Sequence, residues 1–159
     1  AFGKGEAAMA FVTSMNIVCS GLTAEQLRLD VISENITNIN TTRTEAGGAY
    51  RRKMVVFQSE SGRNGFRRAM AAAAKASNRG YEKAGGVRVA DIVEDPTDLP
   101  ITFDPTNPDA DEQGYVEMPN VTLVKEITDA MAATQAYSAN VTAFNTLKSV
   151  IAKSLEIGR

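Results

Sequence analysis

The segment from Val121 to Ile157 contains neither Gly nor Pro, and its apolar residues recur at alternating spacings of three and four. This period predicts one helix of roughly 55 Å at 1.5 Å per residue. Asn120 and Gly158 flank it as candidate N-cap and C-cap residues. A stripe of this length has to be buried against other helices. It consists of Ile127, Ala130, Thr134, Tyr137, Val141, Phe144, Lys148, Ile151 and Leu155.

A second stripe with the same heptad spacing predicts a helix over residues 15–40. Glu25 stands in the one position where an apolar residue is missing, and Leu27 and Val31 widen the stripe. Its last turns enter the Asn- and Thr-rich run SENITNINTTRTEAGG (33–48), whose residue types are poor helix formers. The stripe consists of Met15, Val18, Leu22, Leu29, Ile32, Ile36 and Ile39.

Two arrangements bury both stripes. The helices form an intramolecular antiparallel pair, or they also pack against other copies of the chain. Polar residues on the stripes, such as Glu25, Thr134 and Lys148, favour the second arrangement, because polar positions fix register in many-helix assemblies. We therefore expect a mainly α protein with a small β-containing middle, whose long N- and C-terminal helices pack as a coiled-coil-like pair in a tubular assembly.

The chain of 159 residues divides by sequence into three regions. We expect an N-terminal extension and helix over 1–42, an extended, β-rich middle over 43–118 and a C-terminal helix over 119–159. Alternating or β-branched runs predict strands near 50–58, 86–95, 99–104 and 115–118. The middle region includes a variable insertion at about 59–85. Residues 1–8 fit no later pattern and are interpreted as an upstream extension or a cloning remnant.

Charge is strongly segregated within the middle region. Residues 43–90 hold eleven Lys or Arg against three Glu, whereas residues 91–118 hold nine Asp or Glu and no basic residue. The two blocks face each other within one domain, or they dock head to tail between subunits, which orients assembly. Nucleic-acid binding is not expected, because the acidic block repels phosphate.

Several chemical functions are disfavoured by composition. The chain has no His and a single Cys, Cys19, so the commonest general base, metal ligand and activated nucleophile are missing. The run from Asp109 resembles a calcium loop, but its twelfth position is Asn120 instead of Glu. No apolar run reaches the length of a membrane span, and Thr13, Ser14 and Asn16 interrupt the one candidate signal core. We expect no catalytic residue, cofactor, metal or direct membrane insertion.

Three separated motifs carry a family resemblance. SGLTAEQLRLDVISENITNINTT (20–42) resembles the N-terminal signature of the flagellar rod and hook axial proteins. VEDPTDLPITFDPTNPDADEQGYVEMPNV (93–121) and the C-terminal helix (124–159), with TTRTEAGGAYRRKMVVFQ (41–58), narrow the resemblance to the proximal rod proteins of that family.

The resemblance implies a structural subunit of the flagellar drive shaft, exported through the type III apparatus without a cleaved signal and assembled in the periplasmic part of the basal body. Implied partners are copies of itself, the rod proteins FlgB, FlgF and FlgG, and FliE. A soluble helical adaptor or export chaperone is the alternative, and an enzyme is a distant third.

The residues expected to contact neighbouring subunits lie on the two stripes and among the asparagines. In particular, the asparagines of the first helix are expected to find hydrogen-bond partners in adjacent subunits. The set consists of Leu22, Leu29, Ile32, Asn35, Ile36, Asn38, Ile39, Asn40, Tyr137, Asn140, Val141, Phe144, Ile151 and Leu155.

Overall fold

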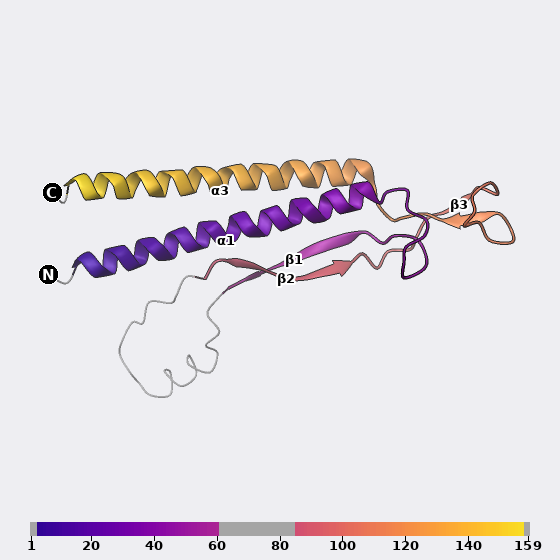
Figure 1. Cartoon of the computed structure of the whole chain (residues 1–159), viewed down its shortest axis with the longest axis horizontal. Coiled ribbons are helices and arrows are strands. Elements are labelled where there is room, and N and C mark those ends of the chain that lie inside the picture. Colours follow the sequence, from indigo (N-terminus) through magenta and orange to yellow (C-terminus); the bar gives the residue numbers. More distant parts are fainter. Residues whose placement is uncertain (1–2, 61–84, 158–159) are drawn as a thin grey trace, which may run out of the picture. The chain divides into compact units, whose positions relative to one another are not determined.

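The computed structural model describes residues 3–60 and 85–157, apart from the side chains of residues 3–10, Leu155 and Ile157. Two helices of 35 residues each bracket four short strands in this described part of the chain (Figure 1). The prediction of a mainly α chain with a small β-containing middle is confirmed. In chain order the elements are α1 (Gly3–Thr37), β1 (Lys53–Ser59), β2 (Val87–Glu94), β3 (Ile101–Phe103), β4 (Tyr115–Glu117) and α3 (Leu123–Ile157).

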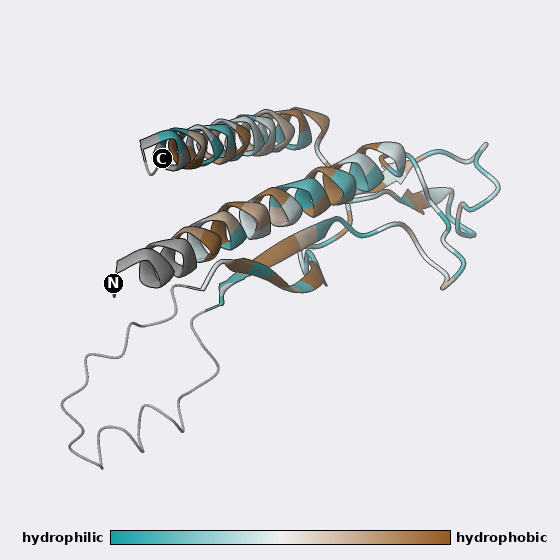
Figure 2. Cartoon of the chain, turned by 60° about the vertical axis from the view of Figure 1, so that its left-hand side comes forward, coloured by the Kyte–Doolittle hydropathy of each residue, from teal (hydrophilic) through white to brown (hydrophobic). Residues whose placement is uncertain are grey.

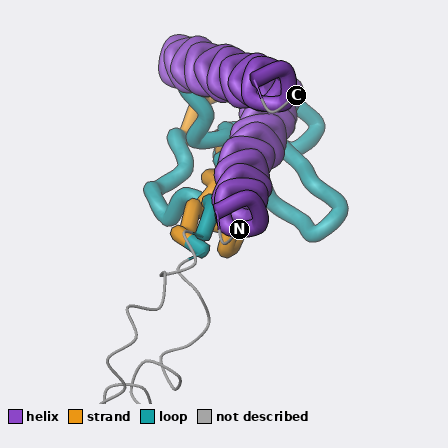
Figure 3. Tube along the Cα trace, turned by 90° about the vertical axis from the view of Figure 1, so that its left-hand side faces the viewer, coloured by secondary structure: helices purple, strands orange, loops and turns teal. Residues whose placement is uncertain are grey.

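The chain forms two compact units. Unit 1 comprises residues 1–24, 57–89 and 137–159, and unit 2 comprises residues 25–56 and 90–136. Each unit therefore takes part of both long helices and draws on all three regions of the sequence. Irregular loops make up residues 38–52 and most of 95–122 (teal in Figure 3). The predicted insertion at about 59–85 lies almost entirely outside the described residues.

Helix α1 differs from the predicted helix at both ends. It begins at Gly3, so residues 3–8 belong to the helix, and it ends at Thr37 instead of residue 40. The Asn- and Thr-rich run closes the helix: Asn38 Nδ2 donates to the carbonyl of Glu34 at 3.0 Å, and Thr41 Oγ1 donates to Asn38 Oδ1 at 3.1 Å. The first of these bonds gives a partner to a carbonyl at the C-terminal end of the helix, where intrahelical partners are missing. The Asn- and Thr-rich run therefore ends α1 and does not continue it.

Helix α3 begins at Leu123, and Asn120 is not its N-cap. The Asn120 amide instead accepts the backbone N–H of Arg52 at 2.7 Å and donates to the Thr97 hydroxyl at 2.9 Å. It also donates to the carbonyl of Asp95 at 3.2 Å. The predicted N-cap was wrong because the local sequence does not show that Arg52 and the loop at residues 95–97, both distant in sequence, form hydrogen bonds with this amide.

In unit 2 the buried apolar residues of α1 belong to the predicted stripe, whereas the buried face of α3 differs from its predicted stripe. Val31, Ile32 and Asn35 of α1 are buried, and Glu126 and Ala133 of α3 have no exposed surface. Hydrophilic and hydrophobic residues, such as Asn35 and Ile32, are therefore both buried. Figure 2 shows that the two kinds alternate along the helices.

On the single chain, exposure differs from the predicted stripe of α3 at its first positions. Ile127 is 47% exposed and Thr134 is exposed, whereas their preceding neighbours Glu126 and Ala133 are fully buried. The face that is buried within the chain is thus rotated by about one residue, or roughly 100°. An ion-paired carboxylate and a small alanine take the inward positions, and burial of Ile127 against other copies stays a prediction.

In unit 1, two segments approach α1 closely around Ser20 and Gly21. The backbone N–H of Val87, at the start of β2, donates to Ser20 Oγ at 3.0 Å. A Cβ built on Gly21 would lie 3.0 Å from Nδ2 of Asn140 on α3. Small residues at these two positions let the strand and the second helix lie against α1.

Two small sheets connect the helices. β1 pairs with β2, and backbone hydrogen bonds from Asp95 to Arg52 and from Glu60 to Gly86 show that the strands are antiparallel. The second sheet, β3 with β4, is antiparallel with Phe103 opposite Tyr115, and their rings pack edge to face with centroids 5.3 Å apart. The predicted strands are therefore confirmed at all four places.

Gly114 is required at the end of the β3–β4 connection. Its φ of +83° is in the left-handed region, and a Cβ there would lie 3.0 Å from the Phe103 ring. Gly47 has a similar φ of +87° with nothing within 4 Å, so it provides a matched control.

We expect Gly114→Ala to lower amide-exchange protection in β3 and β4 by more than tenfold, because conformational strain of about 1 kcal/mol adds to a steric overlap. Gly47→Ala has the strain alone and leaves these strands protected. Hydrogen exchange read at the Asp104 and Met118 amides measures the difference. Equal protection in both variants would contradict the role of the Phe103 contact.

Candidate functional site

A buried ion cluster lies at the centre of unit 2. Arg52 is 6% exposed and donates from Nε to Oε1 of the fully buried Glu126 at 2.5 Å. Its Nη2 contacts Asp129 Oδ2 at 3.0 Å, and its Nη1 lies 3.9 Å from Asp95 Oδ2. A buried charge of this kind is tolerated only when paired and hydrogen-bonded, so the guanidinium and these carboxylates depend on one another.

The Asn35 amide completes the cluster and is fully used within the chain. Its Nδ2 donates to Glu126 Oε2 at 3.0 Å and to the Lys53 carbonyl at 2.9 Å. Its Oδ1 accepts from the Tyr50 hydroxyl and from the Lys53 N–H, both at 2.9 Å. All four hydrogen-bonding positions of the amide are occupied. The Asn35 amide therefore has its hydrogen-bond partners within the chain, and a contact of Asn35 with an adjacent subunit stays a prediction.

The electrostatics around the cluster follow from burial and charge. Burial, with the nearby carboxylates of Glu34, Glu126 and Glu94, raises the pKa of Tyr50 to about 12. Hydrogen bonds from the Thr97 hydroxyl and backbone lower the pKa of Asp95 below its usual range. The phenol thus stays a donor, and the Asp95 carboxylate stays an acceptor, at neutral pH.

The cluster connects several elements of unit 2. It joins α1, the chain entering β1, the end of β2 and the first turns of α3 through groups that already have partners. No group of three or more His, Cys, Asp or Glu among residues 3–60 and 85–157 is placed to hold a metal ion. No helix in the described part of the chain is long and apolar enough to cross a membrane.

Helix α3 presents large apolar side chains outward in unit 2. Ile127 is 47% exposed and Met131 is 68% exposed, and Leu123 and Val124 are exposed on the same side. The spacing of four between Leu123, Ile127 and Met131 puts them in one row. We call these four residues the α3 stripe. A contiguous exposed apolar row on a folded chain marks an interaction surface.

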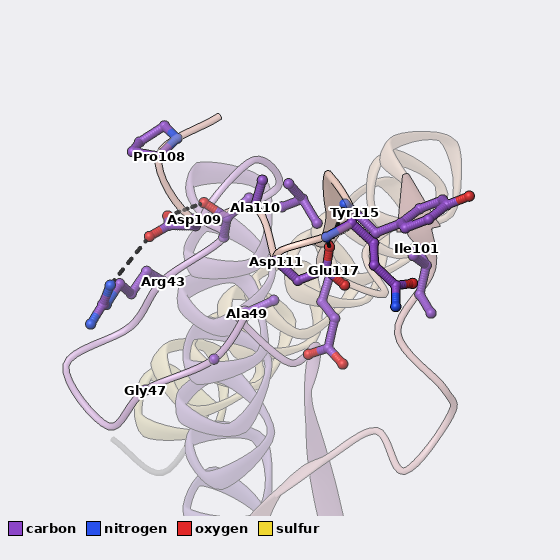
Figure 4. A pocket seen from close by; sticks show the side chains of 14 residues that line it. Arg43, Gly47, Ala49, Ile101, Pro108, Asp109, Ala110, Asp111, Tyr115 and Glu117 are labelled. Atoms are coloured by element: carbon purple, nitrogen blue, oxygen red, sulfur yellow. Dashed lines mark hydrogen bonds and ion pairs between the residues drawn. The ribbon is translucent and has the colours of Figure 1, made fainter. Parts of the chain in front are cut away.

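A groove of about 730 Å³ with a mixed polar and apolar lining lies beside the β3–β4 hairpin in unit 2 (Figure 4). Arg43 and Asp109 lie on one side, joined by an ion pair at 3.5 Å, and Thr42 Oγ1 also donates to Asp109 at 2.8 Å. Ile101 and Tyr115 of the hairpin line the other side. The groove combines charge with apolar surface and is open to solvent.

Comparison with known proteins gives a consistent result along the chain. Residues 15–43 match a family model described as flagella basal body rod protein, and residues 112–157 match one described as flagellar basal body rod FlgEFG protein C-terminal. The flagellar basal-body rod protein FlgC of Bacillus subtilis is 42% identical over 152 residues, covering 92% of this chain and 97% of the relative. The chain belongs to the FlgC family.

Two further FlgC proteins match over similar lengths. The protein of Borreliella burgdorferi is 40% identical and covers 94% of this chain and 98% of its own length. That of Escherichia coli O6:H1 is 38% identical and covers 95% of this chain and all of its own length. The matches extend through the middle region, so the family assignment applies to the whole described chain.

The predicted interface residues of this FlgC-family chain fall into different environments. Ile32 and Asn35 are buried, Asn40 is exposed, and the side chain of Leu155 lies outside the described residues. The others are half-buried, so part of each side chain is accessible on the single chain. They are Leu22, Leu29, Ile36, Asn38, Ile39, Tyr137, Asn140, Val141, Phe144 and Ile151.

Sequence reasoning missed both the ion cluster and the α3 stripe. Arg52 was read only as part of a basic block, and Glu126 was not considered. The sequence signal for the cluster was Glu126. This charged residue lies near the start of the C-terminal helix, one position before Ile127, the first residue of the predicted stripe. Of the four stripe residues, Ile127 belongs to the predicted stripe, and Leu123 and Val124 received no role.

We expect Asn35→Asp to destabilise the chain by about 3 kcal/mol at pH 7, because a second carboxylate would face Glu126. Repulsion and burial raise the pKa of the new carboxyl above its unfolded value of about 3.9. The deficit relative to wild type should therefore shrink as pH falls from 7 towards 4. Urea unfolding followed by far-UV circular dichroism measures it. Asn40→Asp, at an exposed position, is the control, and a deficit that does not change with pH would contradict the prediction.

We expect Tyr50→Phe to remove one tyrosine ionisation from the alkaline absorbance titration, with the difference spectrum centred near pH 12 and not near 10. Because the folded pKa is raised, the stabilisation from protonated Tyr50 is complete below about pH 10 and is lost as pH rises towards 12. Wild type should thus lose more stability than Tyr50→Phe across that interval. A difference spectrum centred at pH 10 would show that the phenol is not buried against the carboxylates.

Proposed function

We propose that this FlgC-family chain is a structural subunit of the flagellar basal-body rod. The subunit assembles through its two long helices, and it transmits torque without catalysis. The observation that carries the proposal is the α3 stripe. Four large apolar side chains lie outward where a self-sufficient helical pair would turn them inward. A neighbouring subunit that covers them removes this surface from water, at about 25 cal/mol per Å².

The ion cluster supports the mechanical part of the proposal. Arg52 and Glu126 tie the loop before β1 to α3, and Asn35 ties both to α1. Breaking a buried pair of this kind costs about 3–5 kcal/mol. A rotating shaft requires subunits that resist shear. The ion cluster transmits force between the helices and strands of unit 2.

Membership of the FlgC family supports several finer proposals. We propose that the terminal helices pack as a coiled-coil-like pair within a tube, that the rod forms in the periplasm after type III export without a cleaved signal, and that neighbours include FlgB, FlgF, FlgG, FliE and copies of this chain. A soluble adaptor or export chaperone is the competing function, and the family relationship does not favour it. Mass spectrometry of detergent-washed basal bodies distinguishes the two, because only a rod subunit is retained there stoichiometrically.

We expect Ile127→Asp and Met131→Asp each to abolish swarming motility and rod incorporation while leaving the monomer's unfolding free energy within about 0.5 kcal/mol of wild type, since both side chains are exposed. Ala132→Asp adds the same charge at an exposed position outside the stripe and should retain motility. Ala133→Asp, in the packed face, should unfold unit 2. Motile cells carrying Met131→Asp would contradict an assembly role for the stripe.

A further inference from the structure

The most exposed apolar side chains of the described chain lie on two surfaces of unit 2. On α3, Val124 is 74% exposed and Met131 is 68% exposed, and on β3, Ile101 is 67% exposed and Phe103 is 62% exposed. No other large apolar side chain that the structure describes is more than 60% exposed. One surface is the α3 stripe and the other is the β3–β4 hairpin. Covering either one removes apolar surface from water.

The hairpin surface is strongly acidic. Residues 98–117, which we call the acidic hairpin, contain six carboxylates and no Lys or Arg. Within residues 3–60 and 85–157, only Asp109 of this set has an ion-pair partner, Arg43. Glu112 and Glu117 are exposed and make no hydrogen bond or ion pair in the same part of the chain. These two carboxylates are available to a basic partner.

The helix surface carries the opposite charge. Within unit 2, α3 covers residues 123–136, whose charged side chains are Lys125, Glu126 and Asp129. Both carboxylates bind Arg52, so the ion cluster takes up the acidic groups of this helix segment. Lys125 is exposed and makes no hydrogen bond or ion pair within the described residues. The charge that this segment leaves unpaired is therefore positive, and it directly follows Val124 of the α3 stripe.

The hairpin also has a recess next to its apolar surface. Ile101, Tyr115 and Glu117 line the groove shown in Figure 4. Tyr115 is 44% exposed, and its ring packs edge to face against Phe103. A methionine side chain is flexible, fills irregular apolar recesses and makes favourable contacts with aromatic rings. Met131 therefore suits this surface, and the two surfaces match in apolar character as well as in charge.

We propose that the α3 stripe of one copy docks against the acidic hairpin of a second copy. Ile127 and Met131 cover the apolar side chains of β3, and Lys125 meets Glu117 at the rim of the contact. Because the two surfaces differ, the contact is heterologous, and its repetition produces an open helical array. The inference rests on the proposed rod function, because it names the partner that covers the α3 stripe.

Two variants, each with one defective surface, test the proposal on the full-length protein. Ile101→Lys places a positive charge on the hairpin, and Met131→Asp places a negative charge on the α3 stripe. In sedimentation velocity, wild type should grow beyond dimers as protein concentration rises, and each variant alone should associate about tenfold more weakly. An equimolar mixture should form dimers and stop there, because only one intact pair of complementary surfaces remains.

Matched controls make the same charge changes elsewhere. Ile92→Lys lies on β2 at a side chain that is 42% exposed, and Ala132→Asp lies on α3 at an exposed position outside the stripe. Both should associate as wild type does. Far-UV circular dichroism with urea unfolding verifies that every variant is folded, so weaker association reports the contact and not the loss of structure.

Charge exchange tests the rim of the contact. Lys125→Glu and Glu117→Lys should each weaken association about tenfold at about 50 mM salt, and the two substitutions in one chain should restore it. Wild type should associate about threefold more weakly at about 300 mM salt. A double variant that stays as weak as the single ones would overturn the pairing of Lys125 with Glu117.

Three results would overturn the docking itself. They are normal association of Ile101→Lys or Met131→Asp alone, a mixture of the two that stays monomeric or grows beyond dimers, and a wild type that stays monomeric. Retention in detergent-washed basal bodies tests the rod function separately. A chain that is retained there but fails the sedimentation test keeps the rod function and loses this contact.

Discussion

The contact between Arg52 and Glu126 is the interaction on which unit 2 depends. Both groups are almost completely removed from water, so removal of either one would leave the other buried without its ion-pair partner. The amide of Asn35 satisfies the second carboxylate oxygen of Glu126 and at the same time binds the backbone of Lys53. One helix from each end of the chain and the entry to β1 are thereby held at a single point. The packed face of α3 is set by this contact more than by its apolar residues.

That choice of face has a consequence for assembly. Because Glu126 and Ala133 take the inward positions, Ile127 and Met131 turn outward. The single chain thus keeps its polar interior satisfied and leaves apolar surface for neighbours. Buried hydrogen bonds and a small apolar core that includes Val31 and Ile32 hold the chain together, while Ile127 and Met131 stay exposed on it.

The Asn- and Thr-rich run shows how local chemistry acts at the end of a long helix. Apolar spacing continues through Ile36 and Ile39, which suggested that the helix continues as well. The Asn38 side chain instead binds the carbonyl of Glu34 and stops α1 at Thr37. Asn35, only three residues earlier, lies inside the helix and serves the ion cluster. Two asparagines in one motif therefore have different roles, and spacing does not separate them.

The sequence by itself determined the two long helices, the four strands, the charge segregation and the family, because period, β-branched runs and motif order are local properties of the chain. It also excluded the commonest catalytic and metal-binding groups, since there is no His. Only the tertiary structure decided which face of α3 is buried, that Asn120 binds Arg52 instead of capping the helix, and that Asn35 is fully satisfied. Those outcomes depend on partners far away in sequence: Arg52 and Glu126 become one buried pair only when the fold excludes water from both.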